Sequence, residues 1–232
     1  MAGVTAAPDL LPPNEEARLA AVRRYAILDT PRDGAFDRIT RIASHVLEMP
    51  IAIVSIVDHD RIWFKSTQGL DGVHQIDRVP GLCASAILAD EPWVVEDARN
   101  DPRTLANPLV AGEFGLGFYA GSQLRTSDGH NLGTLCVIDR EPRQLTAEQL
   151  GVLDDLAALV VDELELRLAA RRQARRATEL NDDVVQALAL AKMQLELGEH
   201  DTALASLDDA LASSKRILGE LVEDAPSLQR DS

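Results

Sequence analysis

The spacing of apolar residues changes twice along the sequence and divides it into three segments. Before residue 50 the spacing is helical, as in the stripe formed by Phe36, Ile39, Ile42 and Val46. Residues 50–139 instead contain short runs of β-branched and aromatic residues separated by turn residues. From Thr146 onwards, apolar residues again recur every three or four positions. This order predicts an α+β domain followed by a long helical segment.

The first segment predicts two helices. "NEEARLAAVRRYAILD" begins with Asn14 in the N-cap position and has acidic residues in its first turn. "DTPRDG" ends this helix, because Pro31 and Gly34 both disfavour its continuation. The second helix is "GAFDRITRIASHVLEM", and its apolar stripe is expected to face the core.

The second segment predicts an antiparallel sheet. "IAIVSIVD" and "RIWFKSTQGL" are separated by "DHD", which is typical of a β-hairpin. "FYAGSQLRT" and "LGTLCVIDR" flank "SDGHN", in which Asp128-Gly129 favours a second tight turn. We therefore expect a sheet with helices before and after it.

The third segment predicts helices with three apolar stripes. "TAEQ" has the form of a capping box at Thr146–Gln149. The first stripe, which suits either a coiled coil or a helix lying on the sheet, comprises Leu150, Leu153, Ala157, Val160 and Leu164. The second comprises Leu180, Val184, Leu188, Ala191 and Leu195, and the third Leu204, Leu207, Leu211, Leu218 and Leu221. Between them Gly198 is placed to end one helix and Asp201 to cap the next. Residues 178–224 thus predict a helical hairpin, and two copies could pack as a four-helix bundle.

Charge and cysteine content exclude several classes of protein. The net charge of −15 at pH 7 argues against general nucleic-acid binding, which relies on Lys and Arg. Cys83 and Cys136 are the two cysteines, too few for a disulfide framework or a four-cysteine zinc site. The sequence contains neither a secretory signal pattern nor an apolar run long enough to span a bilayer. We expect a cytoplasmic protein without nucleic-acid or membrane partners.

Four stretches resemble the GAF domain, in a bacterial sensory subgroup: "YAILDTPRDGAFDRIT", "PIAIVSIVDHDRIWFKSTQGL", "EPWVVEDARNDPRTLANPLV" and "FYAGSQLRTSDGHNLGTLCVIDREPRQL". The resemblance covers about residues 14–170 and implies an antiparallel sheet with flanking helices that serves as a sensory or dimerising module. The expected organisation is a tail at 1–13, the GAF domain at 14–170, a linker helix and hairpin at 171–224, and a tail at 225–232.

The hairpin resembles the dimerisation and histidine-phosphotransfer helices of bacterial sensor kinases, which in one group begin "ELHDxVxQ". Glu179, Asp182 and Gln186 match that motif, and Asn181 stands where the phosphorylated histidine would be. An amide nitrogen is not a nucleophile, because its lone pair is delocalised into the carbonyl. The sequence also has no Gly-rich nucleotide loop, so we expect no enzymatic activity. An alternative interpretation is that Thr178 or Asn181 caps a new helix.

A ligand pocket of the GAF domain is expected between the sheet and its covering loops. Its candidate lining is Trp63, Phe64, Cys83, Phe118, Tyr119 and Cys136, although such aromatic residues also occur as plain core. The sequence requires no cofactor and no metal.

The resulting hypothesis is a non-catalytic signalling protein. Its GAF domain senses a ligand or dimerises, and its hairpin forms a homodimer that could dock a response regulator or a sensor kinase. One alternative is a cysteine-based redox sensor or a GAF-type methionine sulfoxide reductase using Cys83 and Cys136. Another is a small-molecule or haem sensor, for which His74 in the loop "GLDGVHQIDRVP" is the candidate ligand.

Overall fold

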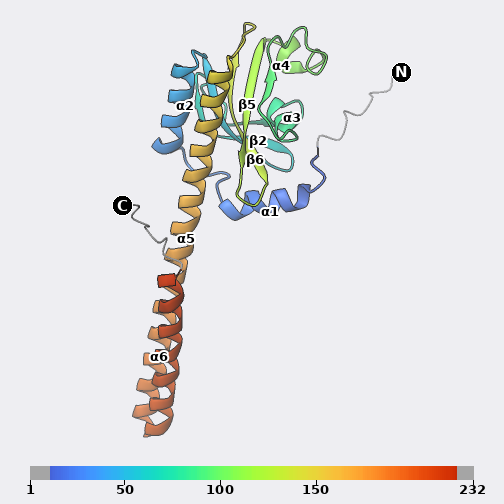
Figure 1. The fold of residues 1–232 in the computed structure, drawn as a ribbon. Helices are drawn as coiled ribbons and strands as arrows, with labels where there is room; N and C mark the ends of the chain where they lie inside the picture. Colours follow the sequence, from blue (N-terminus) through green and yellow to red (C-terminus); the bar gives the residue numbers. More distant parts are fainter. Residues whose placement is uncertain (1–10, 224–232) are drawn as a thin grey trace, which may run out of the picture. The chain divides into compact units, whose positions relative to one another are not determined.

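The computed structural model describes residues 11–223, with side chains up to Gly219 (Figure 1). The chain contains two compact units, Met1–Leu166 and Arg167–Ser232. The tails predicted at 1–13 and 225–232 lie almost wholly outside the described residues, as does the side chain of Leu221. The predicted domain boundary at residue 170 stays a prediction. No helix in the described part of the chain is long and apolar enough to cross a membrane.

A six-stranded antiparallel sheet forms the centre of the first unit, in the order β3-β2-β1-β6-β5-β4. Its strands are β1 (Ile51–Val57), β2 (Arg61–Gln68), β3 (Gln75–Asp77), β4 (Trp93–Val95), β5 (Phe118–Arg125) and β6 (Asn131–Asp139). Both predicted hairpins are confirmed, as β1–β2 and β5–β6. Gly129 adopts the positive φ of 84° that the β5–β6 turn requires. Every residue of β1 is buried, because helices or loops cover both faces of the sheet.

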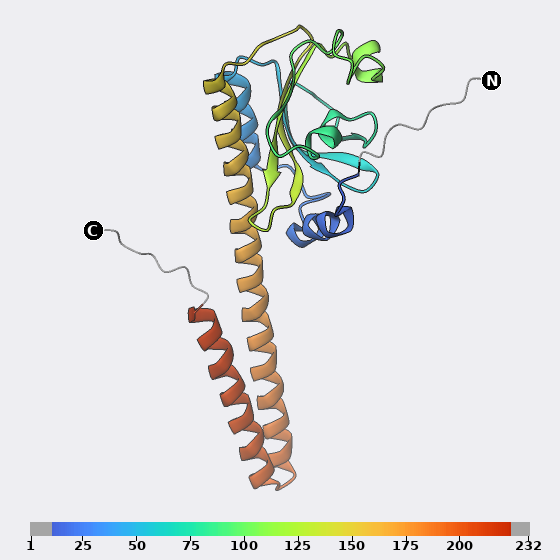
Figure 2. The same ribbon diagram turned by 45° about the vertical axis from the view of Figure 1, so that its right-hand side comes forward.

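Four helices of the first unit surround the sheet: α1 (Glu15–Tyr25), α2 (Gly34–Val46), α3 (Leu82–Ala86) and α4 (Pro108–Ala111). Figure 2 shows α2 on one side of the sheet, together with the beginning of α5, and shows α3 and α4 on the other. The predicted stripe of α2 is partly wrong, because Ile42 and Val46 are exposed. The face of α2 that packs on the sheet is formed by Phe36, Thr40 and Ala43.

The long helix α5 (Ala147–Glu196) begins at the predicted capping box. The Thr146 hydroxyl accepts from the Gln149 amide at 3.2 Å, and the Gln149 side chain accepts from the Thr146 amide at 3.0 Å. In the first stripe, Leu153, Ala157, Val160 and Leu164 are buried, which confirms the alternative of a helix lying on the sheet. Two hydrogen bonds accompany this packing, from the Tyr25 hydroxyl to Glu165 at 2.5 Å and from Ser122 to Asp154.

The interpretation of Thr178 or Asn181 as a helix cap is wrong. Helix α5 continues through both residues without a break. The Thr178 hydroxyl donates to the carbonyl of Ala174, four residues earlier, at 3.1 Å, which is how threonine bonds inside a helix.

The second unit contains the predicted helical hairpin, formed by the end of α5 and by α6 (His200–Glu223). Gly198 has a φ of 83° and ends α5 as expected, since it takes the left-handed conformation at little cost. Asp201 does not cap α6. The helix already begins at His200, so Asp201 lies in its first turn.

Candidate functional site

Helix α3 and the central strand β6 bring the two cysteines together. Cys83 lies on α3, and Cys136 lies on β6 opposite Ile53 of β1. Their sulfur atoms are 3.9 Å apart although the residues are separated by 53 positions in the sequence. Both side chains are buried, with exposed fractions of 5% for Cys83 and 0% for Cys136, and neither forms a disulfide.

Three buried hydroxyl groups lie beside the thiols. The Ser55 and Thr134 hydroxyls are 3.0 Å apart across the β1–β6 pair, and the Tyr119 hydroxyl is 3.4 Å from that of Thr134. We call these five residues (Ser55, Cys83, Tyr119, Thr134 and Cys136) the thiol–hydroxyl cluster. Cysteine and tyrosine were candidate residues from the sequence. Ser55 and Thr134 were not, because their side chains meet the thiols only through strand pairing.

The two thiols of the cluster have opposite pKa shifts. The hydrogen bond from Cys136 lowers the pKa of Cys83 against the opposing effect of burial, and the three hydroxyls add to this lowering. The interaction with Cys83 and burial raise the pKa of Cys136 well above its usual range. Burial is the main reason that the pKa of Tyr119 is raised. The two thiols therefore titrate as a coupled pair, and a negative charge on one opposes ionisation of the other.

The structure divides the predicted pocket lining between the two faces of the sheet. Phe64, Cys83, Tyr119 and Cys136 belong to one buried cluster on the face covered by α3, and Trp93 contacts Tyr119 edge to face at 5.5 Å. Trp63 and Phe118 are also buried but point to the opposite face, because neighbouring residues of a strand alternate. On that face the Lys65 amine lies 5.9 Å from the Trp63 ring and 5.4 Å from the Phe36 ring.

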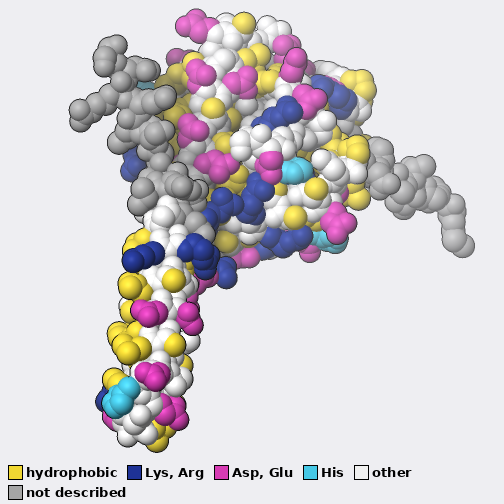
Figure 3. Space-filling view, turned by 60° about the horizontal axis from the view of Figure 1, so that its bottom comes forward, with side chains coloured by type: hydrophobic (Ala, Val, Ile, Leu, Met, Phe, Trp, Pro, Cys, Tyr) yellow, Lys and Arg dark blue, Asp and Glu magenta, His cyan; other side chains and the backbone are white. Residues whose placement is uncertain are grey.

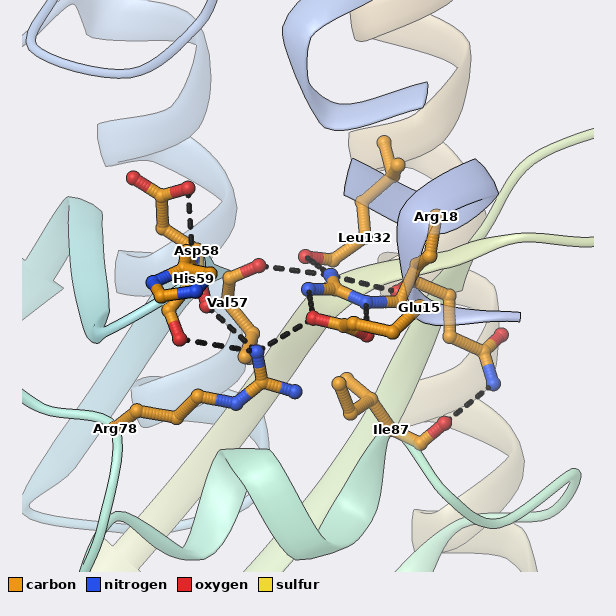
Figure 4. Close-up of polar contacts among 9 residues, drawn as sticks. Glu15, Arg18, Val57, Asp58, His59, Arg78, Ile87 and Leu132 are labelled. Atoms are coloured by element: carbon orange, nitrogen blue, oxygen red, sulfur yellow. Dashed lines mark hydrogen bonds and ion pairs between the residues drawn. The ribbon is translucent and has the colours of Figure 1, made fainter. Parts of the chain in front are cut away.

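A buried ionic network joins α1 to the β1–β2 turn and to the segment after β3 (Figure 4). The Glu15 carboxylate accepts from the guanidinium groups of Arg18 at 2.7 Å and Arg78 at 2.5 Å. Arg18 also donates to the Val57 carbonyl, and Arg78 to the Asp58 carbonyl. Desolvation raises the pKa of Glu15, but the hydrogen bonds from the two arginines outweigh it and lower that pKa. The sequence did not single out this network, because Glu15 and Arg18 read as an ordinary pair on one helix face.

The candidate haem ligand His74 lies on the surface of the first unit. His74 is exposed, and its carbonyl accepts from the Phe64 amide at the end of the sheet. Among the described residues, no group of three or more His, Cys, Asp or Glu side chains could hold a metal ion. Near the N-terminal helix there is a hollow of about 210 Å³, lined in part by Arg18, His130 and Asn131.

The kinase-like motif lies on the exposed surface of α5 in the second unit. Glu179, Asn181, Asp182 and Gln186 are all exposed. Glu179 accepts from the Arg175 side chain at 2.9 Å, an i,i+4 pair of the usual helical kind. No structural feature of this stretch distinguishes Asn181 from its neighbours on the helix.

The hairpin leaves a row of leucines uncovered. Small residues, such as the buried Ala191 and Ala203, lie where the two helices meet, and the Ser206 hydroxyl donates to Gln194 across them. Leucines at seven-residue intervals remain 48–61% exposed, namely Leu188 and Leu195 on α5 and Leu204, Leu211 and Leu218 on α6. We call these five residues the hairpin seam. In Figure 3 hydrophobic side chains, in yellow, follow the length of the hairpin.

Comparison with known proteins gives matches of sequence and of fold. A protein of Pseudomonas aeruginosa named cyclic di-GMP phosphodiesterase is 44% identical over 151 residues, which cover 65% of this chain and 26% of that protein. The chain therefore spans about a quarter of the length of this relative.

One solved structure with this fold and one weaker structural match both have low sequence identity to the chain. The GAF domain from Acinetobacter phosphoenolpyruvate-protein phosphotransferase is 16% identical with a TM-score of 0.50, covering 67% of this chain and 95% of that one. The free methionine-R-sulfoxide reductase from Neisseria meningitidis is 17% identical with a TM-score of 0.47, covering 75% and 98%. The family model of the GAF domain matches residues 31–164, more than half of the sequence. This chain belongs to the GAF domain family.

Proposed function

We propose that the chain is a non-catalytic signalling protein whose helical hairpin forms a homodimer and presents a docking surface to a response regulator or a sensor kinase. In this proposal the GAF domain receives the signal, and the hairpin carries it to the partner. The GAF domain is the part that the family match establishes. The hairpin's role is inferred from its own residues.

The hairpin seam is the observation that carries the dimer. Five leucines, spaced by seven residues within each helix, are about half exposed in the single chain. Seven-residue spacing is that of helices that pack against one another along a seam. Burial of leucine side chains is strongly favourable, and a second copy offers the same seam in return. A four-helix bundle made by two hairpins buries the leucines of both copies.

Asn181 supports binding without phosphotransfer. The residue stands where sensor kinases of the similar group have the phosphorylated histidine, and its amide cannot accept a phosphoryl group. Its exposure, together with that of Asp182 and Gln186, leaves the motif accessible to a partner. A hairpin of this kind would hold a response regulator or a sensor kinase without taking phosphate from it.

The dimer is tested by light scattering coupled to size-exclusion chromatography. The wild-type chain is expected to elute with the mass of a dimer at micromolar concentration, and Leu204→Glu/Leu211→Glu to elute as a monomer. Leu105→Glu is the matched control, because Leu105 is equally exposed but lies in a loop of the first unit. A wild-type monomer at that concentration, or a double variant that stays dimeric, contradicts the proposed bundle.

The docking surface is tested with a panel of purified bacterial receiver domains and kinase dimerisation domains by biolayer interferometry. Wild-type protein is expected to bind at least one, and Asp182→Lys to weaken that binding about tenfold or more, since a reversed charge at an interface is repelled. Asp71→Lys, an exposed position of the first unit, serves as the control. Transfer of phosphate from a phosphorylated partner to the wild-type hairpin would overturn the claim that this element is inactive in phosphotransfer.

The activity named for the Pseudomonas aeruginosa relative is not part of this proposal. That protein is about four times as long as the matched stretch, and a GAF domain carries no single chemistry of its own.

A further inference from the structure

The thiol–hydroxyl cluster contains two thiols in direct contact to which the proposed signalling role assigns no function. Cys83 and Cys136 lie on different elements, and their sulfur atoms are 3.9 Å apart. A disulfide needs a sulfur–sulfur distance of about 2 Å. Rotation of the two cysteine side chains about their Cα–Cβ bonds can bring the sulfur atoms closer by the remaining ~2 Å. Such a buried pair is one two-electron oxidation away from a covalent bond.

We propose that Cys83 and Cys136 form a redox-active pair, which a peroxide converts into a disulfide within one chain, linking α3 to β6. The GAF domain would then respond to an oxidant through its own core, without a bound cofactor. This inference goes beyond the proposed function and does not depend on the hairpin.

The reaction is balanced with hydrogen peroxide as the oxidant. The Cys83 thiolate attacks one peroxide oxygen, the O–O bond breaks, and Cys83 becomes a sulfenic acid while the leaving hydroxide takes up a proton to form water. The Cys136 sulfur then attacks the Cys83 sulfur, forming the S–S bond and releasing the sulfenic oxygen as a second water with the Cys136 proton. Two thiols and one peroxide give one disulfide and two waters.

The polar neighbours of the pair favour Cys83 as the attacking thiol. A thiolate is the reactive species, and in an apolar core it needs hydrogen-bond donors. The Cys136 thiol and the hydroxyls of Ser55, Thr134 and Tyr119 supply them, and they lower the pKa of Cys83 despite its burial. Cys83 is also the more exposed of the two, at 5% against 0% for Cys136, so it is the thiol that meets the oxidant first.

The oxidant reaches the pair through the α3 side of the domain. Helix α3 has only five residues. In the sequence it lies between β3 and β4, which have three residues each and form the two edges of the sheet. Short elements with few backbone hydrogen bonds open locally more readily than central strands. Opening of α3 would expose Cys83 and leave Cys136 on β6 in place.

The test is the intact mass of the full-length protein after exposure to hydrogen peroxide. The oxidised chain is expected to lose about 2 Da. After denaturation it should take up no alkylating agent, and a dithiol reductant should restore two alkylated cysteines. The disulfide should also raise the melting temperature, because it closes a loop of the unfolded chain. Two thiols that remain alkylatable, or a disulfide between two chains on a non-reducing gel, would overturn the proposal.

Two variants separate the steps. In Cys136→Ser the peroxide should leave Cys83 as a sulfenic acid that dimedone traps, and in Cys83→Ser no trapped product should form on Cys136. Thr134→Val, which removes one hydroxyl at nearly constant volume, should slow formation of the disulfide several-fold without preventing it. An unchanged rate in Thr134→Val contradicts the role given to the hydroxyls. The mass measurement on the wild-type protein decides the disulfide even if a variant does not fold.

Discussion

Helix α5 carries two apolar stripes of the same spacing, and they meet different surroundings. In the first stripe Leu153, Val160 and Leu164 are at most 2% exposed, because this part of the helix packs within the unit that holds the sheet. In the second, Leu188 and Leu195 are 55% and 48% exposed. The sequence pattern is nearly the same in both. Periodicity therefore reports which face of a helix is apolar, and the fold determines what covers that face.

The exposed stripe can bind a partner, whereas the buried stripe cannot. The first stripe is buried from Leu153 to Leu164 within one chain, and this part of it is not available to a partner. The hairpin seam is available, and it is the basis of the proposed dimer. Four measurements of stability test whether the two stripes differ in this way.

The largest effect is expected from truncating a side chain of the buried stripe. Leu153→Ala should lower the free energy of unfolding by about 3 kcal/mol, since it removes buried methyl groups and leaves a cavity. Leu159→Ala on the same helix, where the leucine is exposed, should change it by less than about 0.5 kcal/mol. Urea titration followed by tryptophan fluorescence measures both values. Equal losses in the two variants would mean that the two faces of α5 are not distinguished as described.

The next effect concerns protein concentration. If the hairpin folds as a dimer, a tenfold dilution should reduce the stability of the helical hairpin by about 1.4 kcal/mol, while the sheet domain should be insensitive to dilution. Far-UV circular dichroism follows the helices. Trp63 and Trp93 are the two tryptophans and both belong to the first unit, so fluorescence follows that unit alone. A melting transition of the helices that does not depend on protein concentration would contradict the proposed dimer.

A smaller effect is expected where α1 holds the buried part of α5. Tyr25→Phe should cost about 1 kcal/mol at neutral pH, because it removes the hydrogen bond to Glu165. Burial, together with that hydrogen bond, raises the pKa of Tyr25 from 10 to about 12. Because the pKa of Tyr25 is higher in the folded chain than its value of 10 in the unfolded chain, this residue contributes to stability at pH values below 10. The contribution is lost as the pH rises towards 12. The difference between wild type and variant should therefore shrink between these pH values. A difference in unfolding free energy that stays constant over this pH range would mean that Tyr25→Phe destabilises the fold through packing and not through the hydrogen bond.

The smallest effect distinguishes two positions at which the sequence offers a helix cap, Thr146 and Thr178. Thr146→Ala should cost about 1 kcal/mol, because Thr146 caps the helix. Thr178→Ala should be neutral or stabilise by a few tenths of a kcal/mol, since Thr178 lies inside the helix, where alanine is the better residue. Thermal unfolding by circular dichroism compares the two. A larger cost at Thr178 would place a helix start there after all.

Much of the fold could be predicted from local patterns. The two β-hairpins, the capping box at Thr146 and the helix end at Gly198 each depend on residues within a few positions of one another. The errors arose where the local signal was ambiguous. Ile42 and Val46 fit the apolar spacing of α2 but lie outside its packed face, and Asp201 offers a cap one residue after α6 has begun.

The candidate site was predictable only in part. The sequence placed Phe64, Cys83, Tyr119 and Cys136 among the pocket candidates, and the structure gathers these four. It separates Trp63 and Phe118 from them, because strand alternation assigns the two residues to the other face. The hydroxyls of Ser55 and Thr134 carried no signal, since serine and threonine are common in strands and their neighbours are set by register.

Local sequence preferences specified the two β-hairpins, the capping box at Thr146 and the helix end at Gly198, because each of these depends on a few neighbouring residues. The tertiary structure alone decided the contact between two thiols 53 positions apart, the network around Glu15 and the unequal burial of the two stripes of α5. Such contacts depend on which surfaces meet when the chain folds, and no local preference specifies the partner of a face that is merely apolar.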